Sequence, residues 1–92
     1  MVVPQRNSIY KYIIMKSLEE FVALFAEQFD DTDVNEIQAN TNFRDLDEWS
    51  SIIGLSIIAM VDEEFEVALK ADDMKKAITV GDLYEIVKQK VA

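Results

Sequence analysis

The chain contains no cysteine and no histidine among its 92 residues. Without cysteine it has no disulfide framework, so the fold depends on packing and suits a reducing cytosol. Without thiolate and imidazole it also lacks the ligands of nearly every transition-metal site and most nucleophile–base pairs. We therefore expect a cytoplasmic protein with no metal site and no catalytic residues of these types.

Glycine and proline are also scarce, with two and one residues respectively. Because these residues supply the turns of all-β chains, the composition favours helices. No apolar run reaches the roughly 18 residues that a membrane-spanning helix needs. A chain of this length suits one domain that buries about 60–65% of its unfolded surface. The sequence therefore predicts one all-α domain without a membrane span.

Charge is distributed unevenly along the chain, whose net charge is −9. Residues 1–15 contain Arg6 and Lys11 and no acid, so residues 16–92, with seven basic and 18 acidic residues, carry −11. Such a surface repels nucleic-acid phosphates and anionic lipids and attracts basic proteins. We predict partner enzymes with Lys/Arg patches, no nucleic-acid partner, and a monomer, because this net charge opposes self-association.

The first fourteen residues differ from the rest. They have neither the long apolar region nor the small-residue cleavage site of a signal peptide. Met15 is a second possible start directly before a helix signal. For residues 1–14, a tag, an upstream start and a genuine N-terminal extension all stay open. We expect residues 15–92 to form the folded domain.

Hydrophobic periodicity predicts a first helix over residues 17–29. Ser17 and Glu20 fit a capping box. Apolar residues follow at helical spacing: Leu18, Phe21, Val22, Phe25 and Phe29. The next segment, residues 30–46, reads as a long connection rich in Asp, Asn and Thr. Its expected anchors in the core are Val34, Ile37, Phe43 and Leu46.

Three further helices are predicted. The second begins at Ser50 or Ser51, either of which can cap it, and continues to an acidic end at residues 62–66. Residues 71–77 form a short third helix, and residues 79–82 open the last. The expected apolar positions of the last helix are Val80, Leu83, Tyr84, Val87 and Val91.

The second helix is apolar nearly all the way round between residues 52 and 61. Because only three other helices surround it, part of its start, Ile53 in particular, is expected to face solvent or a partner. Gly54 in its interior costs about 1 kcal/mol relative to alanine. This cost indicates either a packing requirement or the close approach of a ligand.

Residues 31–35 match the first half of a twelve-residue calcium-binding loop, with oxygen-bearing side chains at alternate positions. However, Glu36 occupies the position that needs glycine, and Asn42 replaces the bidentate glutamate. We therefore predict no metal site.

Three segments resemble the acyl carrier proteins: FRDLDEWSSI (residues 43–52), VDEEF (61–65) and ITVGDL (78–83). The resemblance covers about residues 17–90. In that family an Asp-Ser-Leu motif starts the second helix, and its serine carries 4′-phosphopantetheine. The resemblance implies a small four-helix bundle of this type, with Ser51 as the attachment point. Here Ser50 replaces the Asp, Ile52 replaces the Leu, and two commonly acidic positions are Ile53 and Ser56.

The resemblance also implies the function of a carrier, not of an enzyme. A phosphopantetheinyl transferase attaches the arm, and loading and client enzymes then handle a fatty acyl, polyketide or aminoacyl thioester. An apolar cargo is expected between the second and third helices. The implied partner-binding residues are Asp47, Glu48, Ile52, Ile53, Leu55, Ser56, Glu63, Glu64 and Glu66.

A physical argument supports this attachment point. A phosphodiester on Ser51 would lie beside free N–H groups at the positive end of a helix. The arm would also bring the thiol that the chain lacks. Two alternatives stay open. One is a carrier-like interaction module that is never modified, supported by Ser50 in place of Asp. The other is a small hydrolase or isomerase that uses two carboxylates, supported only by the abundance of acids.

Overall fold

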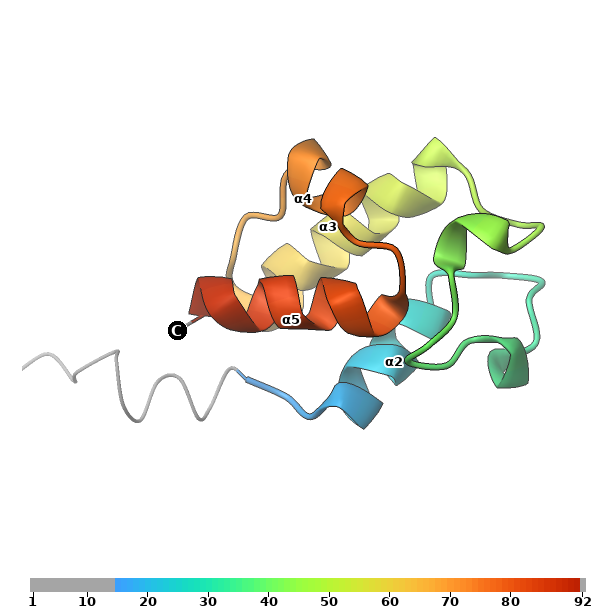
Figure 1. Cartoon of the computed structure of the whole chain (residues 1–92), viewed down its shortest axis with the longest axis horizontal. Helices are drawn as coiled ribbons and strands as arrows, with labels where there is room; N and C mark the ends of the chain where they lie inside the picture. Colours follow the sequence, from blue (N-terminus) through green and yellow to red (C-terminus); the bar gives the residue numbers. More distant parts are fainter. Residues whose placement is uncertain (1–14, 92) are drawn as a thin grey trace, which may run out of the picture.

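The computed structural model describes residues 15–91, so the predicted extension, residues 1–14, lies outside the described residues. Helices α2, α3 and α5 pack on one another, and the short α4 lies against α5 (Figure 1). This arrangement confirms the predicted all-α fold, with three main helices and one short helix, which is the third along the chain. The elements are α2 (Leu18–Ala26), η2 (Val34–Glu36), η3 (Phe43–Asp45), α3 (Ser51–Phe65), α4 (Ala71–Lys76) and α5 (Val80–Val91), the η elements being 3₁₀ helices.

The capping box at the start of α2 is confirmed. The Ser17 hydroxyl accepts a hydrogen bond from the Glu20 N–H at 3.1 Å, and the Glu20 carboxylate accepts one from the Ser17 N–H at 3.1 Å. This second bond lowers the pKa of Glu20. The predicted end at residue 29 is wrong, because the N–H groups of Gln28 and Phe29 bond to carbonyls three residues back and close a tight turn after the helix.

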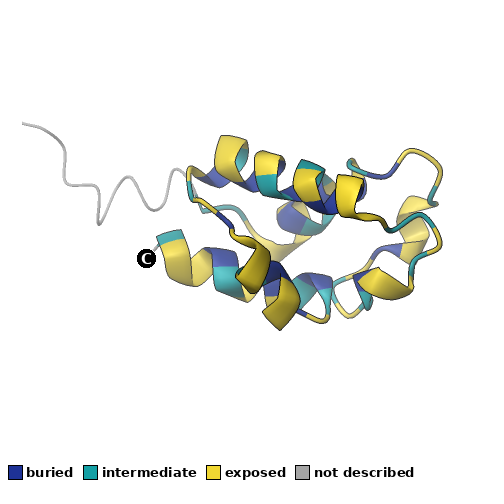
Figure 2. Cartoon of the chain, turned by 90° about the horizontal axis from the view of Figure 1, so that it is seen from above, coloured by how far each residue is buried: buried dark blue, intermediate teal, exposed yellow. Residues whose placement is uncertain are grey.

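Aromatic rings join the three main helices. The Phe21 ring centroid of α2 lies 5.7 Å from that of Phe65 in α3 and 5.5 Å from that of Tyr84 in α5. Burial of each such side chain stabilises the fold by about 1.5–3 kcal/mol relative to an exposed position. Buried positions lie on the sides of the helices that face one another, and exposed positions lie outside (Figure 2).

The connection between α2 and α3 is packed down, as predicted, although not through every expected anchor. Ile37 and Phe43 are buried, and Leu46 is half-buried. Val34 is 65% exposed, so the prediction that it anchors the connection is wrong. Its element, η2, is a single turn, and the residue that enters the core is Ile37, directly after that turn.

The start of α5 is tied to the same connection. The Gly81 N–H donates to the Ala39 carbonyl at 2.8 Å. A Cβ atom on Gly81 would lie 3.1 Å from that carbonyl oxygen, so the close approach favours glycine. The Asp82 carboxylate accepts from the Thr79 N–H at 3.0 Å, and this bond lowers the pKa of Asp82. The predicted opening of the last helix is thus confirmed.

Candidate functional site

The turn that leads into α3 is held against the core by Trp49. Its ring centroid lies 4.8 Å from that of Phe43 and 6.5 Å from that of Phe29. A Cβ atom placed on Gly54 would meet the indole at 3.6 Å. The glycine therefore lies under the indole, but 3.6 Å is an ordinary van der Waals contact, so packing does not require glycine here. Because of these contacts, the chain enters α3 from a turn fixed to the core.

Glu48 connects the same turn to the residues that follow α2 through hydrogen bonds. Its carboxylate accepts hydrogen bonds from the backbone N–H groups of Asp30 at 2.8 Å and Asp31 at 3.0 Å. The Thr32 hydroxyl donates a third, at 2.6 Å, and this bond is the main reason why the pKa of Glu48 is lowered. The sequence predicted Glu48 as a contact for basic partners, but both of its oxygens already accept hydrogen bonds within the chain.

Ser50 and Ser51 have different positions at the start of α3. Ser50 is the N-cap, and its hydroxyl accepts from the Ile53 N–H at 3.3 Å. Ser51 is the first residue of the helix and is exposed. Its hydroxyl makes no hydrogen bond to any other residue between 15 and 91. The cap is therefore Ser50, and the Ser51 hydroxyl faces solvent without a structural role.

The N-terminal end of α3 differs from those of the other helices in its charge. Of the α-helices within residues 15–91, only α3 has no acidic residue in its first turn. The first N–H groups of a helix lack intrahelical acceptors, and the partial positive charge there favours anions. No carboxylate of α3 competes for this position. The arrangement suits a phosphate group on Ser51.

The apolar residues beside Ser51 divide between surface and core. Ile52 and Leu55 are 74% and 66% exposed, and Ser56 is half-buried. Ile53 is only 8% exposed, so the prediction that it faces solvent or a partner is wrong. The reason is helical spacing, because Ile53 lies on the buried stripe formed with Ile57, Met60 and Val61.

The predicted acidic contact residues other than Glu48 lie at the two ends of α3. Asp47 is exposed in the turn before the helix. Glu63, Glu64 and Glu66 lie at the other end, where Glu66 stops the helix in the left-handed conformation with φ 55°. Glu64 forms an ion pair with Lys16 at 3.7 Å. Between the two ends, residues 51–61 carry no charge.

Comparison with protein families matches residues 19–87 to the family described as "Phosphopantetheine attachment site", well over half of the chain. The chain belongs to this family. Comparisons with the curated proteins and with the solved structures gave no match. The family carries covalently attached 4′-phosphopantetheine, so the chain has the role of a phosphopantetheine-dependent carrier. Carrier domains of this family are typically non-catalytic.

The start of α3 fits the cofactor of this carrier family. The exposed Ser51 hydroxyl offers an oxygen for a phosphodiester, and the helix end offers N–H groups to its charged oxygens. Ser50 precedes the predicted attachment point at the position of the family's Asp, and its hydroxyl caps the helix without adding a negative charge. A capping function is therefore retained at this departure from the motif.

The part that Arg44 plays in this carrier domain was missed in the sequence. Its guanidinium donates to the carbonyls of Ala77, at 2.6 Å, and Met74 at the C-terminal end of α4. The last carbonyls of a helix lack intrahelical donors, so Arg44 caps a helix too short to be stable alone. A signal was present, because Arg44 is the one basic residue among the acids of residues 30–48.

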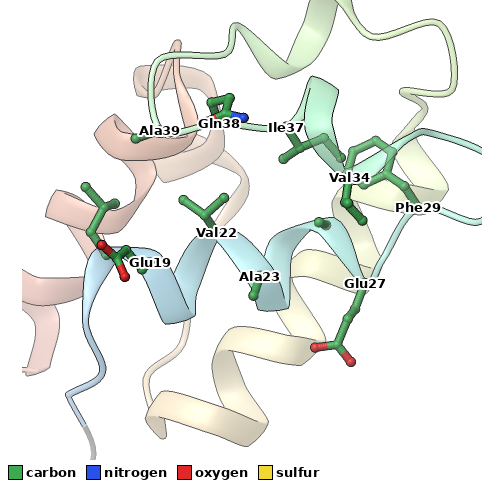
Figure 3. Close-up of a pocket in the computed structure, with 11 residues that line it drawn as sticks. Glu19, Val22, Ala23, Glu27, Phe29, Val34, Ile37, Gln38 and Ala39 are labelled. Carbon is green, nitrogen blue, oxygen red and sulfur yellow. The ribbon is translucent and has the colours of Figure 1, made fainter.

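A groove of about 700 Å³ lies between α2 and residues 34–39 (Figure 3). Figure 3 shows Val22 pointing from α2 towards the opposite wall, which contains Ile37 and Ala39, while Glu27 points away. Its lining residues all come from α2 and the following connection, none from α3 or α4. The groove is therefore distinct from the space between α3 and α4, where a sheltered cargo stays a prediction.

None of the helices described for this carrier domain combines the length and hydropathy needed to cross a membrane. Within residues 15–91, no three acidic side chains are placed together so that they would hold a metal ion.

Proposed function

We propose that the chain carries an acyl or aminoacyl group as a thioester on 4′-phosphopantetheine attached to Ser51. The observation that carries this proposal is the exposed Ser51 hydroxyl, free of a capping role, at the only acid-free α-helix start within the described residues. During attachment the Ser51 oxygen forms a bond to phosphorus, the phosphorus–oxygen bond to the nucleotide part of coenzyme A breaks, and the hydroxyl proton leaves. Ser51 is thus an attachment point and not a catalyst.

The chain's own contribution is position. Trp49 and Glu48 fix the turn before α3, and Ser50 caps the helix, so the attachment oxygen has a defined place on the surface. The bound arm supplies the thiol that carries the cargo. A chain without cysteine or histidine needs no catalytic group of its own for this role.

Partner enzymes would meet two kinds of surface around the arm. Ile52, Leu55 and Ser56 form an apolar surface beside Ser51, from which the buried Ile53 is excluded. The carboxylates at the ends of α3, those of Asp47, Glu63, Glu64 and Glu66, would engage basic patches. The partners are a phosphopantetheinyl transferase and the enzymes that load or receive the cargo. We propose a cytoplasmic monomer for this role.

Peptide fragmentation by mass spectrometry tests the attachment point. The protein is co-expressed with a phosphopantetheinyl transferase, digested, and the modified peptide is fragmented between Ser50 and Ser51. We expect the adduct on Ser51 alone. An adduct on Ser50 would overturn the assignment, and a chain that stays unmodified would favour the carrier-like interaction module.

A further inference from the structure

The acidic and basic residues are distributed differently along the sequence. All but four of the 18 acidic residues precede residue 67, whereas five of the nine basic residues follow it. Along α3 itself, negative charge is absent beside Ser51 and begins at Asp62. Glu63 lies twelve residues from Ser51, which corresponds to about 18 Å along a helix axis. A partner attracted by charge therefore contacts α3 at a distance from the attachment point.

A second groove lies at this acidic end, between α2 and α3. Its volume is about 280 Å³, just below the range of about 300–1,000 Å³ that is typical of small-molecule pockets. A groove of this size suits the side chains of a protein segment. Leu24 of α2 lines it together with Glu27 and Gln28, which directly follow that helix. The lining residues from α3 are Ser56, Ala59, Met60, Glu63 and Glu64. The groove thus combines apolar and small side chains with carboxylates of α3 and of the C-cap of α2.

The carboxylates of this groove differ in their partners. Glu64 pairs with Lys16, whereas Glu27 and Glu63 are exposed and form no ion pair within residues 15–91. Glu27 is the C-cap of α2 and Glu63 belongs to α3, so the two carboxylates reach the groove from different elements. Cations on a partner segment would pair with these two carboxylates, because charged pairs across an interface set orientation and association rate.

We propose that the groove between α2 and α3 binds a basic, amphipathic helical segment of a client enzyme, about 18 Å along α3 from the arm. The segment places apolar side chains over Ala59 and Met60 and lysines or arginines against Glu27 and Glu63. This inference rests on the proposed carrier function for the presence of clients. It adds a docking site that includes α2 and that requires the client's basic residues to lie away from the mouth of its active-site channel.

A second acidic hollow provides a comparison. It is larger, about 410 Å³, and is lined mainly by polar residues of the connection, including Asp31, Glu36 and Asp45. Leu46 is its one apolar lining residue. If charge alone governed binding, a basic segment would favour this hollow, so the two sites distinguish charge from the combination of charge and apolar contact.

The test is an NMR titration of the unmodified protein with a synthetic helical peptide of about 15 residues that has lysines four positions apart in an alanine and leucine background. We expect saturable amide shifts centred on Glu27, Ala59 and Glu63. The double variant Glu27→Gln/Glu63→Gln is expected to weaken binding about tenfold. The control Asp31→Asn/Asp45→Asn removes the same charge from the other hollow and is expected to change affinity less than about twofold.

Several results would overturn the proposal: no saturable binding, shifts centred on residues 31–48, or equal losses in the two double variants. Dimerisation of the free protein that is abolished by Glu27→Gln/Glu63→Gln would also overturn it, because a second copy would then fill the groove. The titration needs no arm on Ser51. Peptide binding at the groove and modification of Ser51 are therefore tested in separate experiments, and one can fail without the other.

Discussion

Separate alanine substitutions of Ser50 and Ser51 are expected to have opposite effects on stability and on modification. The Ser50 hydroxyl satisfies the Ile53 N–H at 3.3 Å, a long hydrogen bond, so Ser50→Ala should cost about 0.5–1 kcal/mol, the lower part of the usual range for a lost cap. Ser51→Ala removes a hydroxyl without a structural partner and introduces a better helix former. Its free energy of unfolding should stay the same or rise slightly.

Urea unfolding followed by far-UV circular dichroism measures this difference. With a slope of about 1–2 kcal/mol per molar urea for a small domain, the midpoint of Ser50→Ala should fall by about 0.3–1 M, while that of Ser51→Ala should not fall. Modification should show the reverse pattern, being lost in Ser51→Ala and retained in Ser50→Ala. A clear destabilisation by Ser51→Ala would refute the division of roles, because Ser51 would then be part of the helix cap.

Three further predictions concern the elements that hold the site. Folding lowers the pKa of Glu48 below its usual 4.5, so the ionised carboxylate stabilises the fold above that pH, and this stabilisation is lost as the pH falls through the folded pKa. Glu48→Gln should therefore be less stable than wild type at neutral pH, and the urea midpoints of the two proteins should converge in acid. Gly54→Ala should stabilise the protein by up to about 1 kcal/mol. Gly81→Ala should destabilise it, because the new Cβ atom lies 3.1 Å from a backbone oxygen. Equal shifts of the melting temperature in these two variants would contradict this difference in the space around the two glycines. Arg44→Gln should lose about 1–3 kcal/mol and speed amide hydrogen exchange in α4 more than in α5; unchanged exchange in α4 would show that the guanidinium is not its cap.

The sequence predicted the helices best where one face of a helix is apolar. In α5 the predicted positions Val80, Leu83, Tyr84 and Val87 are all buried, because polar residues between them leave one possible orientation. The capping box at Ser17 and Glu20 was likewise predicted, because its partners are three residues apart. These features depend on local spacing, which the sequence displays directly.

The errors arise where spacing is uninformative or partners are distant. In α3, apolar residues surround the helix, so the sequence did not distinguish the buried Ile53 from the exposed Ile52. The contacts of Glu48 and Arg44 join residues 16 to 33 positions apart in the chain. No local pattern predicts such pairs, because they depend on how the connection folds back onto the helices. Ser51 as the attachment point stays a prediction from motif spacing, and the structure adds that Ser50 takes the capping role.

The intact mass of the protein after incubation with coenzyme A and a broad-specificity phosphopantetheinyl transferase tests the central claim most directly. Wild type and Ser50→Ala should each gain the mass of one phosphopantetheine group, and Ser51→Ala should gain none. A wild-type chain that stays unmodified, even with the transferase of its own organism, or a Ser51→Ala variant that still gains the group, would contradict the assignment of Ser51 as the attachment point.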